Sequence, residues 1–574
     1  MTSVSRHLLL LTLACALGCS RSAAPPPSAA GPRPVLLVTI DTLRADRLGC
    51  YGDAGARTPV IDRLARQGVV FERAYTPAPI TLPAHASILT GLLPPAHGVR
   101  ANGAFALGPE MPTLAEVFRA RGMATAAFVG AFPLARRFGT GRGFDHYDEA
   151  FGKAGGVRYE FSERPGSAVV AAALAWLRGQ SGPVFLWVHL FEPHAPYEPP
   201  PQFAGADPYR GEIAAADAAL APLIAAWDAR GGGVLALLSD HGEAFGEHGE
   251  ESHSLFVYDT TLRVPLILRG AGLPAGQRVP VSVGIERVAA TLVEAAGLSA
   301  ALPGKSLLPA ARGQRAAAEP LYAESLAPRL DFGWSELRSW REGRYKYVRA
   351  PRPELFDIDS DPGEARNLAG ARPSQLAAME KALALASRED RMARARPDAE
   401  AAERLRALGY VQSAETRQAS GIDPKDRVDV ARAIARAAGP FRDYAEAASV
   451  YTALARRAPE VPVVNLRLAD ALLRSGRAAA ALPHYEKVIA AAPRTADAHV
   501  GLATALAGLG RLAEAERVLL RGLEVDAANG QLHYNLGEIE RARGRSDEAR
   551  ARYEAARSDP VTRERAERRL AELR

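Results

Sequence analysis

The chain has 574 residues, of which 48% are hydrophobic, 24% charged and 7% aromatic, and its formal net charge is +6. This composition lies near globular averages and excludes a disordered, collagen-like or polytopic membrane protein. The 3 cysteines exclude a disulfide scaffold. The 71 basic and 65 acidic residues form no block of like charge, so we expect no nucleic-acid partner.

The N-terminal segment has the pattern of an export signal. An apolar run over residues 8–17 is too short to span a bilayer, and Gly18-Cys19 follows it. This arrangement resembles a bacterial lipoprotein signal, in which the cysteine is acylated after cleavage. We therefore expect a signal peptide over 1–19, a Pro/Ala-rich tether over 20–34, and an exported lipoprotein anchored in the membrane and facing the periplasm or cell surface. An ordinary cleaved secretory signal is the alternative.

Apolar runs and helical stretches alternate along residues 35–412. The runs that we interpret as buried strands are Val35–Ile40, Val184–Val188 and Val234–Leu238. The stretches that we interpret as helices are Pro59–Gln67, Pro112–Arg121, Ser167–Arg178 and Ile213–Ala229. This alternation predicts an α/β sandwich with a mostly parallel central sheet.

Polar side chains follow each of the three predicted strands. They are Asp41 after the first strand, His189, Glu192 and His194 after the second, and Asp240 and His241 after the third, with His253 further on. Ligands of open parallel sheets bind beyond the carboxyl ends of the strands, so these groups are expected at one edge. Two carboxylates with several imidazoles favour a divalent ion such as zinc or manganese. Each residue by itself could equally be a buried, hydrogen-bonded structural group.

Thr81 begins a short predicted helix that ends at Gly91, with Pro83 in its first turn. A hydroxyl at that place lies at the positive end of the helix dipole, beside backbone N–H groups that attract anions. Metal coordination would lower the pKa of the hydroxyl and turn it into a nucleophile. The alternative is that Thr81 merely caps its helix.

Residues 422–574 carry an internal repeat. Alanines recur every 34 residues at Ala447, Ala481, Ala515 and Ala549, and glycines keep the same spacing at Gly476, Gly510 and Gly544. This period, with a helix expected over 424–438 before the first full repeat, resembles the tetratricopeptide repeat. Each helix pair needs a small residue where its helices touch, and its neighbour buries the apolar face. Such arrays bind a peptide or protein partner, which we expect here.

Several segments together resemble the sulfatase family. They are Asp41–Gly52, Thr58–Ala65, Ser239–Glu243, Leu262–Pro265, Glu354–Asp357 with Asp361-Pro362, and Leu408–Val411. The resemblance covers roughly residues 33–412. It implies the alkaline-phosphatase-like α/β sandwich of that superfamily, whose members cleave sulfate or phosphate esters at a metal-bound nucleophile.

The chain departs from the sulfatase pattern at the nucleophile. Sulfatases carry Cys or Ser in Cys/Ser-x-Pro-x-Arg, which is oxidised to formylglycine. Thr81 stands at the nucleophile position and His85 stands where the arginine belongs, so this modification is not available. The paired Asp-Asp after the first strand is Asp41-Thr42, which leaves too few carboxylates for a typical calcium shell. Thr nucleophiles occur in the superfamily's phosphoethanolamine and phosphoglycerol transferases and nucleotide phosphodiesterases.

The resemblance assigns a role to each candidate residue. One ion, with zinc or manganese favoured over calcium, would be bound by Asp41, Thr81, Asp240 and His241. His194 and His253 resemble the transferases' histidines and would bind substrate and act in catalysis, or hold a second ion. Asn102 resembles the phosphodiesterases' phosphate-binding asparagine. Roles for Glu192, His85, His97 and His189 are less defined, since a structural-support role suits them equally.

Three functions compete. The first is a hydrolase or transferase that cleaves phosphate esters through a covalent Thr81 intermediate, which the departures favour. The second is a sulfuric ester hydrolase that works without formylglycine. The third is an inactive sulfatase-like domain that serves the repeats as a scaffold. The substrate itself, and the choice between hydrolysis and transfer, are not encoded in any motif of the chain.

Overall fold

A computed structural model describes residues 31–151, 164–270, 272–299, 302–395, 420–437, 443–493, 495–559 and 562–573. The predicted signal peptide, most of the tether and the Leu408–Val411 motif lie outside these residues. Among the helices that are described, none combines the length and the apolar character needed to cross a bilayer.

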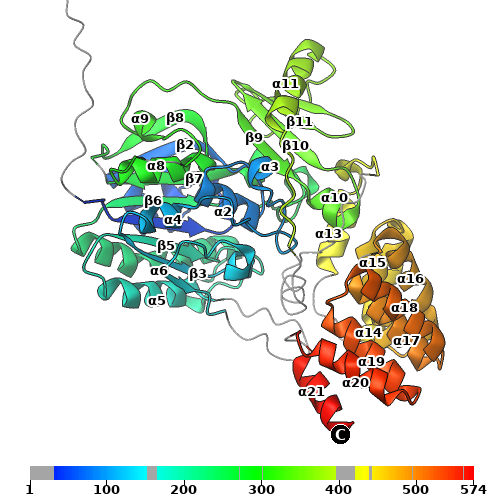
Figure 1. Ribbon diagram of the computed structural model, residues 1–574. Helices are drawn as coiled ribbons and strands as arrows, with labels where there is room; N and C mark the ends of the chain where they lie inside the picture. Colours follow the sequence, from blue (N-terminus) through cyan, green and yellow to red (C-terminus); the bar gives the residue numbers. More distant parts are fainter. Residues whose placement is uncertain are drawn as a thin grey trace, which may run out of the picture. The chain divides into compact units, whose positions relative to one another are not determined.

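The central sheet has eight strands in the order β4-β3-β5-β1-β6-β7-β2-β8 (Figure 1). The strands are β1 (Val35–Ile40), β2 (Val69–Tyr75), β3 (Ala124–Val129), β4 (His146–Asp148), β5 (Val184–Leu190), β6 (Val234–Ser239), β7 (Arg263–Arg269) and β8 (Gln277–Gly284). Neighbouring strands are parallel except around β7, which runs antiparallel to β6 and β2. The predicted, mostly parallel sheet is therefore confirmed, with β1 between β5 and β6.

Helices cover both faces of this sheet (Figure 1). One layer contains α1 (Pro59–Gln67), α5 (Gly166–Arg178) and α6 (Pro208–Ala229), and the other contains α2 (Thr81–Thr90), α4 (Leu114–Arg119) and α8 (Val288–Ala295). Because side chains alternate along a strand, Leu36 and Val38 of β1 pack in the first layer and Leu37 in the second. Full burial of each such side chain contributes about 1.5–3 kcal/mol.

Two predicted helices have different bounds in the structure, and caps explain both. α6 begins before Ile213 because Asp207 accepts a hydrogen bond from the Arg210 amide and Pro208 occupies the first turn. α4 begins at Leu114, later than predicted, because Thr113 and Glu116 form a reciprocal capping box.

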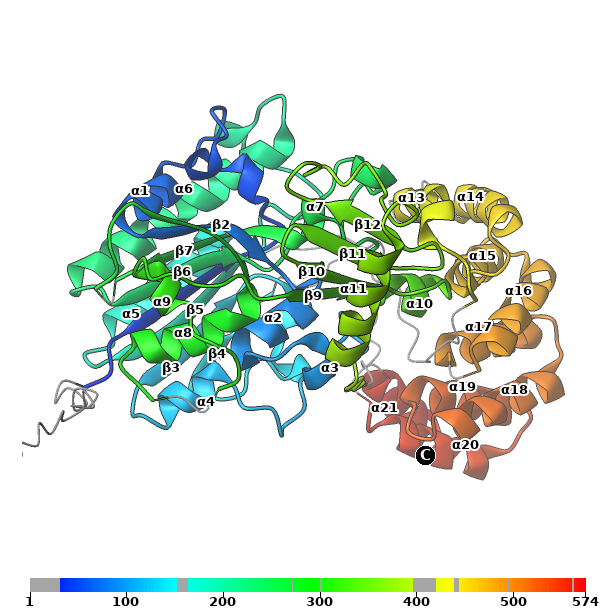
Figure 2. The same ribbon diagram turned by 90° about the horizontal axis from the view of Figure 1, so that it is seen from above.

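A second, four-stranded antiparallel sheet follows the first in the chain (Figure 2). Its strands are β9 (Leu321–Ser325), β10 (Leu337–Glu342), β11 (Tyr345–Arg349) and β12 (Glu354–Asp357). Helix α11 (Pro373–Ala386) packs on it through Met379 and Leu383. Sequence reasoning assigned no elements here, because charged side chains such as the buried Lys346 interrupt the apolar pattern.

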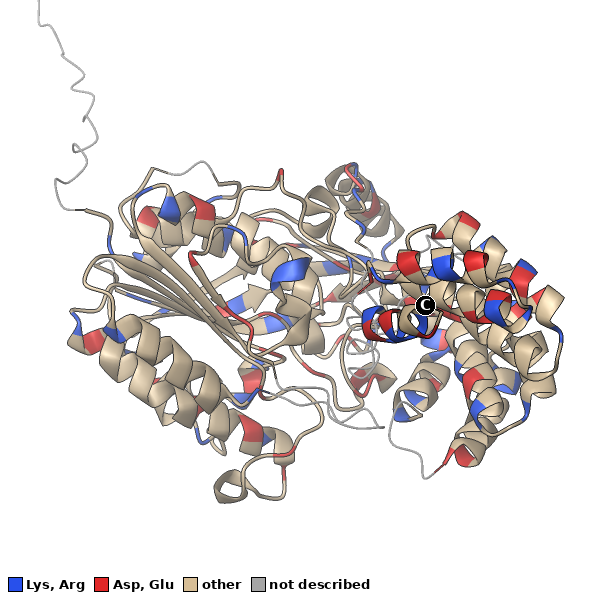
Figure 3. Ribbon diagram, turned by 60° about the horizontal axis from the view of Figure 1, so that its bottom comes forward, with Lys and Arg blue, Asp and Glu red and all other residues tan. Residues whose placement is uncertain are grey.

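The repeats form antiparallel helix pairs. Their helices are α14 (Tyr444–Arg457), α15 (Pro462–Arg474), α16 (Ala478–Ala491), α17 (Ala496–Gly508), α18 (Leu512–Val525), α19 (Gly530–Ala542), α20 (Ser546–Ala556) and α21 (Arg563–Glu572). The four alanines at 34-residue spacing are all buried, as close helix contacts require. Acidic and basic residues are interspersed over these helices (Figure 3).

The helix predicted over 424–438 is divided in the structure. A 3-10 turn covers Pro424–Asp426, and α13 covers Val428–Arg436. Arg427 between them has φ −126° and ψ 9°, outside the helical region. The Asp423 carboxylate stabilises the separate turn by accepting a hydrogen bond from the Lys425 amide.

A buried ion-pair cluster stabilises the second sheet. Asp259 of α7 (Asp259–Leu262) accepts hydrogen bonds from Arg341 and from Lys346, whose ammonium lies 2.8 Å from it and 2.6 Å from Glu364. Burial alone would raise the pKa of Asp259, but Arg341 and Lys346 lower it well below its ordinary value. This contribution to stability is therefore complete above pH ~4 and is lost as the pH falls.

We predict that Asp259→Asn destabilises the full chain by about 3–5 kcal/mol, because it leaves two buried cations with one partner. Urea unfolding at pH 7 measures the change. Asp359→Asn is the matched control, since Asp359 makes a half-exposed pair with Arg73 and should matter little. Equal unfolding midpoints for the two variants would contradict this account of the cluster.

Candidate active site

Three strands of the central sheet bring the predicted polar residues to one edge. Asp41 follows β1 directly, and its amide donates to the Leu190 carbonyl at the end of β5. Asp240 and His241 follow β6 on the other side of β1. Because β1 lies between β5 and β6, the carboxyl ends of all three strands meet there.

Asp41, Asp240 and His241 form a fully buried cluster whose inward atoms have no hydrogen-bond partner in the described part of the chain. His241 Nε2 lies 3.5 Å from Asp41 Oδ1 and 3.6 Å from Asp240 Oδ2. Among the described residues, neither Asp41 oxygen, nor Asp240 Oδ2, nor His241 Nε2 makes a hydrogen bond. One ligand atom from each residue lies within 4.8 Å of the others. Burial raises the pKa of Asp41 to about 8 and that of Asp240 well above its ordinary value.

This donor set fits a divalent cation. The Nδ1 atom of His241 lies 3.0 Å from the Gly242 carbonyl, which only accepts, so Nδ1 donates and the neutral ring presents a lone pair at Nε2. Two carboxylates and one imidazole lone pair then converge on one point. Without a cation, their mutual repulsion and desolvation would be strongly unfavourable. Carboxylate oxygen and imidazole nitrogen are the ligands of zinc and manganese.

Thr81 is the first residue of α2, and it is buried. The N-cap residue of the helix is Ile80, so Thr81 occupies the first helical position instead of the cap position that the capping alternative requires. Gly91 ends the helix with φ +77°, in the left-handed conformation that glycine favours. The Thr81 hydroxyl therefore belongs to the positive end of a ten-residue helix.

Asn102 is held at the same helix start. Its Oδ1 accepts a hydrogen bond of 2.8 Å from the amide of Leu82, the residue after Thr81. This bond determines which end of the amide group faces the helix. The structure thus brings Asn102 next to Thr81 across 21 residues of sequence.

His194 and His253 form a second group of imidazoles beside the cluster. Their ring centres are 5.2 Å apart, and the ring of His253 is 4.5 Å from that of His241. Burial alone would lower the pKa of His253, but the Glu243 carboxylate, with Asp41 and Glu250, raises it to about 9. Burial lowers the pKa of His194 to about 4. One imidazole is therefore a proton donor near neutral pH, and the other is neutral.

Glu243 and Tyr197 position His253, and sequence reasoning gave neither of them a role. Glu243 Oε1 lies 3.0 Å from His253 Nδ1, and Glu243 Oε2 accepts a hydrogen bond from the Tyr197 hydroxyl at 2.9 Å. The sequence feature that points to Glu243 as a site residue is its place in the Ser239–Glu243 motif. The signal for Tyr197 was its place three residues after His194.

Two of the four less-defined residues have structural roles. His97 bonds Ser87 through Nε2 and accepts from the Val99 amide at Nδ1, so both of its nitrogens are used within the fold. Both carboxylate oxygens of Glu192 accept from the single Gly166 amide N–H at the start of α5, as a helix-capping carboxylate does.

His85 and His189 differ from this pair because both reach the carboxylate cluster. His85 Nδ1 bonds the Thr81 carbonyl at 2.8 Å and lies 3.5 Å from Asp240 Oδ2. His189 Nε2 lies 3.5 Å from Asp41 Oδ2. Both are fully buried, and burial lowers the pKa of His189 to about 3.

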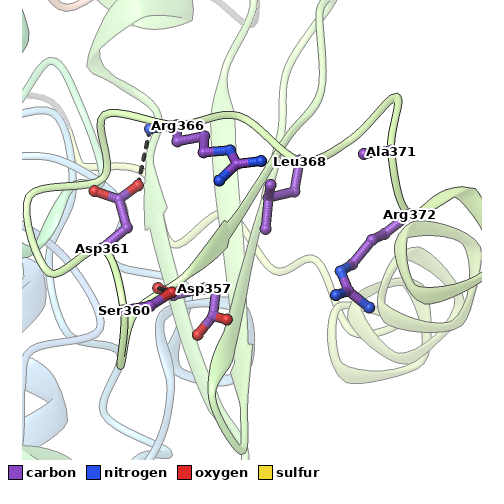
Figure 4. A pocket seen from close by; sticks show the side chains of 7 residues that line it. All are labelled: Asp357, Ser360, Asp361, Arg366, Leu368, Ala371 and Arg372. Carbon is purple, nitrogen blue, oxygen red and sulfur yellow. Dashed lines mark hydrogen bonds between the residues drawn. The ribbon is translucent and has the colours of Figure 1, made fainter.

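A separate pocket lies beside the second sheet (Figure 4). It is lined by Asp357, Ser360, Asp361, Arg366, Leu368, Ala371 and Arg372. Its carboxylates are engaged locally, since Asp361 accepts from the Arg366 amide and Asp357 pairs with Arg344. The described residues of this pocket do not bring together carboxylate oxygens and an imidazole nitrogen without hydrogen-bond partners, as the end of β1 does. We therefore place the candidate active site at the strand ends.

Comparisons with known proteins find similar proteins for two parts of the chain. Residues 33–298 match the sulfatase family model, and residues 432–494 and 472–531 match tetratricopeptide repeat models. Mouse steryl-sulfatase is 40% identical over 134 residues, which are 21% of this chain and 22% of that protein. A Delta 4,5-hexuronate-2-O-sulfatase of Bacteroides thetaiotaomicron is 24% identical over 409 residues, covering 58% of this chain and 84% of that protein.

Solved structures share the fold of the catalytic part. The phosphonate monoester hydrolase of Agrobacterium radiobacter superposes with a TM-score of 0.54 at 22% identity, covering 62% of this chain and 95% of that one. A putative sulfatase from Bacteroides thetaiotaomicron gives 0.53 at 21% identity, covering 63% and 94%. The chain thus shares the fold of these two proteins.

The fold of the part that precedes the repeats is sulfatase-like. Residues 33–298 match the sulfatase family model, and tetratricopeptide repeats follow that part of the chain. The boundaries predicted at 35–412 and 422–574 stay predictions, because the family models match narrower ranges.

We predict that adding Zn²⁺ or Mn²⁺ to chelator-treated protein raises its melting temperature, because a cation relieves the repulsion between Asp41 and Asp240. At an ion concentration 100 times the Kd, the stabilisation is about 2.7 kcal/mol. Asp240→Asn should lose most of this shift. The control His97→Gln should keep it, since His97 makes its hydrogen bonds within the fold. A full metal-induced shift in Asp240→Asn would disprove the assigned site.

Proposed function

We propose that the chain is a metal-dependent hydrolase or transferase that cleaves phosphate esters through a covalent intermediate on Thr81. The observation that carries the proposal is the place of Thr81: it starts a buried helix whose first turn, through His85, contacts the carboxylate cluster. A nucleophilic hydroxyl, an anion-attracting helix start and a cation-binding group are thereby held together.

The residues that would hold the ion are Asp41, Asp240, His241 and Thr81. When bound, a divalent ion would lower the pKa of a coordinated hydroxyl and neutralise charge on the ester oxygens. The chain's own residues supply the remaining functions. Asn102 would donate to a phosphoryl oxygen through the N–H of its side-chain amide, and the dipole of α2 favours negative charge there.

The reaction divides into two displacements. In the first, Thr81 Oγ, which has lost its proton to solvent before the step, forms a bond to phosphorus as the bond to the ester oxygen breaks. The leaving oxygen takes a proton from His253, which its carboxylate partner Glu243 keeps protonated near neutral pH. In the second, water or an acceptor alcohol gives its proton back to His253 and attacks phosphorus, and Thr81 is released.

Two observations in this chain favour phosphorus over sulfur. Thr81 cannot become formylglycine, and His85 stands where sulfatases have arginine. Nδ1 of His85 makes a hydrogen bond with the Thr81 carbonyl, and Nε2 makes one with Thr39. His85 therefore supports the start of the helix, whereas an arginine at this position would offer a guanidinium to an anion. A sulfuric ester hydrolase without formylglycine is the second candidate, supported by the sulfatase relatives. An inactive scaffold is the third.

Location and partners complete the proposal. We propose that the protein is exported, acylated at Cys19 and anchored in the membrane, and that the repeats bind a protein or peptide. The support for the anchor is the short apolar run before Gly18-Cys19, and for the partner it is the repeat array. Radiolabelled palmitate should enter the wild-type chain and not Cys19→Ser. Equal labelling of both would exclude this anchor.

We predict that Thr81→Ala lowers kcat by at least about 10³-fold, because it removes the atom that forms the covalent bond. Thr81→Ser keeps a hydroxyl on the same helix and should retain measurable turnover. Steady-state kinetics with a phosphate diester and added Zn²⁺ or Mn²⁺ test both variants. Turnover of Thr81→Ala at the wild-type rate would eliminate Thr81 as the nucleophile.

We predict a higher kcat/KM for phosphate diesters or phosphonate monoesters than for aryl sulfates with the same leaving group. Because the substrates carry the same leaving group, a difference in their kcat/KM values reports the preference for phosphorus or sulfur as the central atom. Exclusive turnover of the aryl sulfate would favour the sulfuric ester hydrolase. Absence of turnover for all three classes in metal-loaded protein would favour the scaffold.

A further inference from the structure

Residues 244–252 fold back on themselves and form what we call the 244–252 turn. The amide of Gly246 donates to the Glu250 carbonyl at 2.7 Å, and the amide of Ala244 donates to the Ser252 carbonyl at 2.8 Å. Both bonds belong to one pairing register, because the two pairs are centred on the same residue of the chain. A shift of the tip of the turn by one residue would therefore change the pairing at its base.

The 244–252 turn joins the two side chains that the proposed mechanism pairs. Glu243 comes directly before the turn and His253 directly after it, so the same pairing continues by one residue and sets them opposite each other. Glu243 Oε1 lies 3.0 Å from His253 Nδ1 at this place. The geometry of the turn therefore decides where the His253 ring lies relative to its carboxylate partner.

Arg44 holds one side of the turn. Its guanidinium donates to the Glu243 carbonyl at 3.0 Å and to the Glu247 carboxylate at 2.7 Å. Arg44 follows β1 closely in the chain, so these two bonds tie the base and the first half of the turn to the central sheet.

Helix α13 holds the other side of the turn. Val428, Arg432 and Arg436 are four residues apart and therefore share one face of the helix. The guanidinium of Arg432 donates to the Gly249 carbonyl at 2.7 Å. Arg432 and Arg436 both pair with the carboxylate of Glu251. The second half of the turn is thus held by side chains from beyond the catalytic part.

The contact between α13 and the turn is close enough to need a glycine. A Cβ atom on Gly249 would lie 3.2 Å from both methyl carbons of Val428 and 3.3 Å from a guanidinium nitrogen of Arg432. Gly249 also has φ +83°, in the left-handed region that glycine favours. A side chain at this position would push the helix and the turn apart.

The opposite face of α13 anchors the helix. Val430 and Ile434 are buried in the apolar cluster that also contains Leu255, two residues after His253. At the end of α13, the Ala437 carbonyl accepts a hydrogen bond of 2.8 Å from the Tyr451 hydroxyl of α14. The helix that precedes the first full repeat therefore joins the repeats to the segment that carries His253.

We propose that α13 is a positioning element of the active site, in which Arg432 holds the 244–252 turn in the register that presents His253 to the leaving group. The inference rests on the proposed function, in which His253 gives a proton to the leaving oxygen, and it deepens that function. The part of the chain that carries the repeats then contributes to turnover, in addition to binding a partner.

The competing arrangement is a packing contact that has no effect on the turn. In it, Arg44 and the two hydrogen bonds within the turn suffice to fix the register, and α13 only attaches the repeats. The two arrangements differ in how turnover depends on the leaving group. A poor leaving group needs a well-placed proton donor, whereas a good leaving group departs with little proton transfer.

The test compares the metal-loaded full chain with its Arg432→Met variant, which keeps an unbranched side chain and loses the guanidinium. We expect kcat to fall about 10-fold for a phosphate diester that releases phenol and less than about 2-fold for one that releases 4-nitrophenol, since a positioned acid contributes about 10²- to 10⁴-fold. KM should stay within about 2-fold of wild type for both.

Two further variants separate positioning from packing. Arg432→Lys keeps a cationic donor for the Gly249 carbonyl and should recover part of the lost turnover. Arg457→Gln removes an exposed ion pair between α14 and Asp429 of α13 that lies outside the turn, and it should match wild type.

Amide hydrogen exchange supplies a readout that does not depend on activity. Arg432→Met should speed the exchange of the Ala244 and Gly246 amides, because both donate within the turn, and Arg457→Gln should leave it unchanged. Unchanged exchange in Arg432→Met, or a fall in kcat that is equal for the two leaving groups, would overturn the proposal.

If Arg432→Met does not fold, Glu251→Gln is the second variant, since it removes the charge that Arg432 and Arg436 share from the turn side. Wild-type exchange and a wild-type dependence on the leaving group in Glu251→Gln would then overturn the proposal. Failure of the proposed function looks different: wild-type protein would turn over neither diester, and the exchange of the turn would still decide whether α13 holds it.

Discussion

The carboxylates of Asp41 and Asp240 are fully buried, side by side, at the end of the central strands, and among the described residues their inward oxygens make no hydrogen bond. Such a pair is unfavourable by itself, since desolvation and like charge both oppose ionisation. The rest of the catalytic part is arranged around this constraint. Parallel strands deliver the two carboxylates, and His241 presents a lone pair to both of them. A cation is the group that makes the arrangement stable.

The burial of the Asp41 and Asp240 carboxylates links the stability of the fold to the proposed catalysis. The proposed nucleophile Thr81, the start of α2 and the proposed proton donor His253 are all held by elements that contact the carboxylate cluster. His85 ties the first turn of α2 to Asp240 and to Thr39, and Glu243 holds His253 above His241. Substitutions among these supporting side chains should therefore change metal affinity and geometry before they change the overall fold.

Much of the site could be predicted from the sequence because its residues follow apolar runs. Val35–Ile40 and Val234–Ser239 end at Asp41 and Asp240, and a parallel sheet places such ends together. Thr39 could not be found in this way, since it looks like any polar residue inside a strand. Glu192 and His97 looked like site residues by position, but each of them makes structural hydrogen bonds. The second sheet was missed because its stability depends on buried ion pairs around Lys346, which resemble a surface pattern in sequence.

The central claim is that Thr81 becomes covalently bonded to the group it removes from the ester. Its most direct test is mass spectrometry of metal-loaded protein quenched during turnover of a phosphate diester, with the modified peptide sequenced. The account predicts a phosphorus-containing adduct on Thr81, absent from Thr81→Ala. An adduct on another residue, or unmodified protein throughout a measurable turnover, would contradict it.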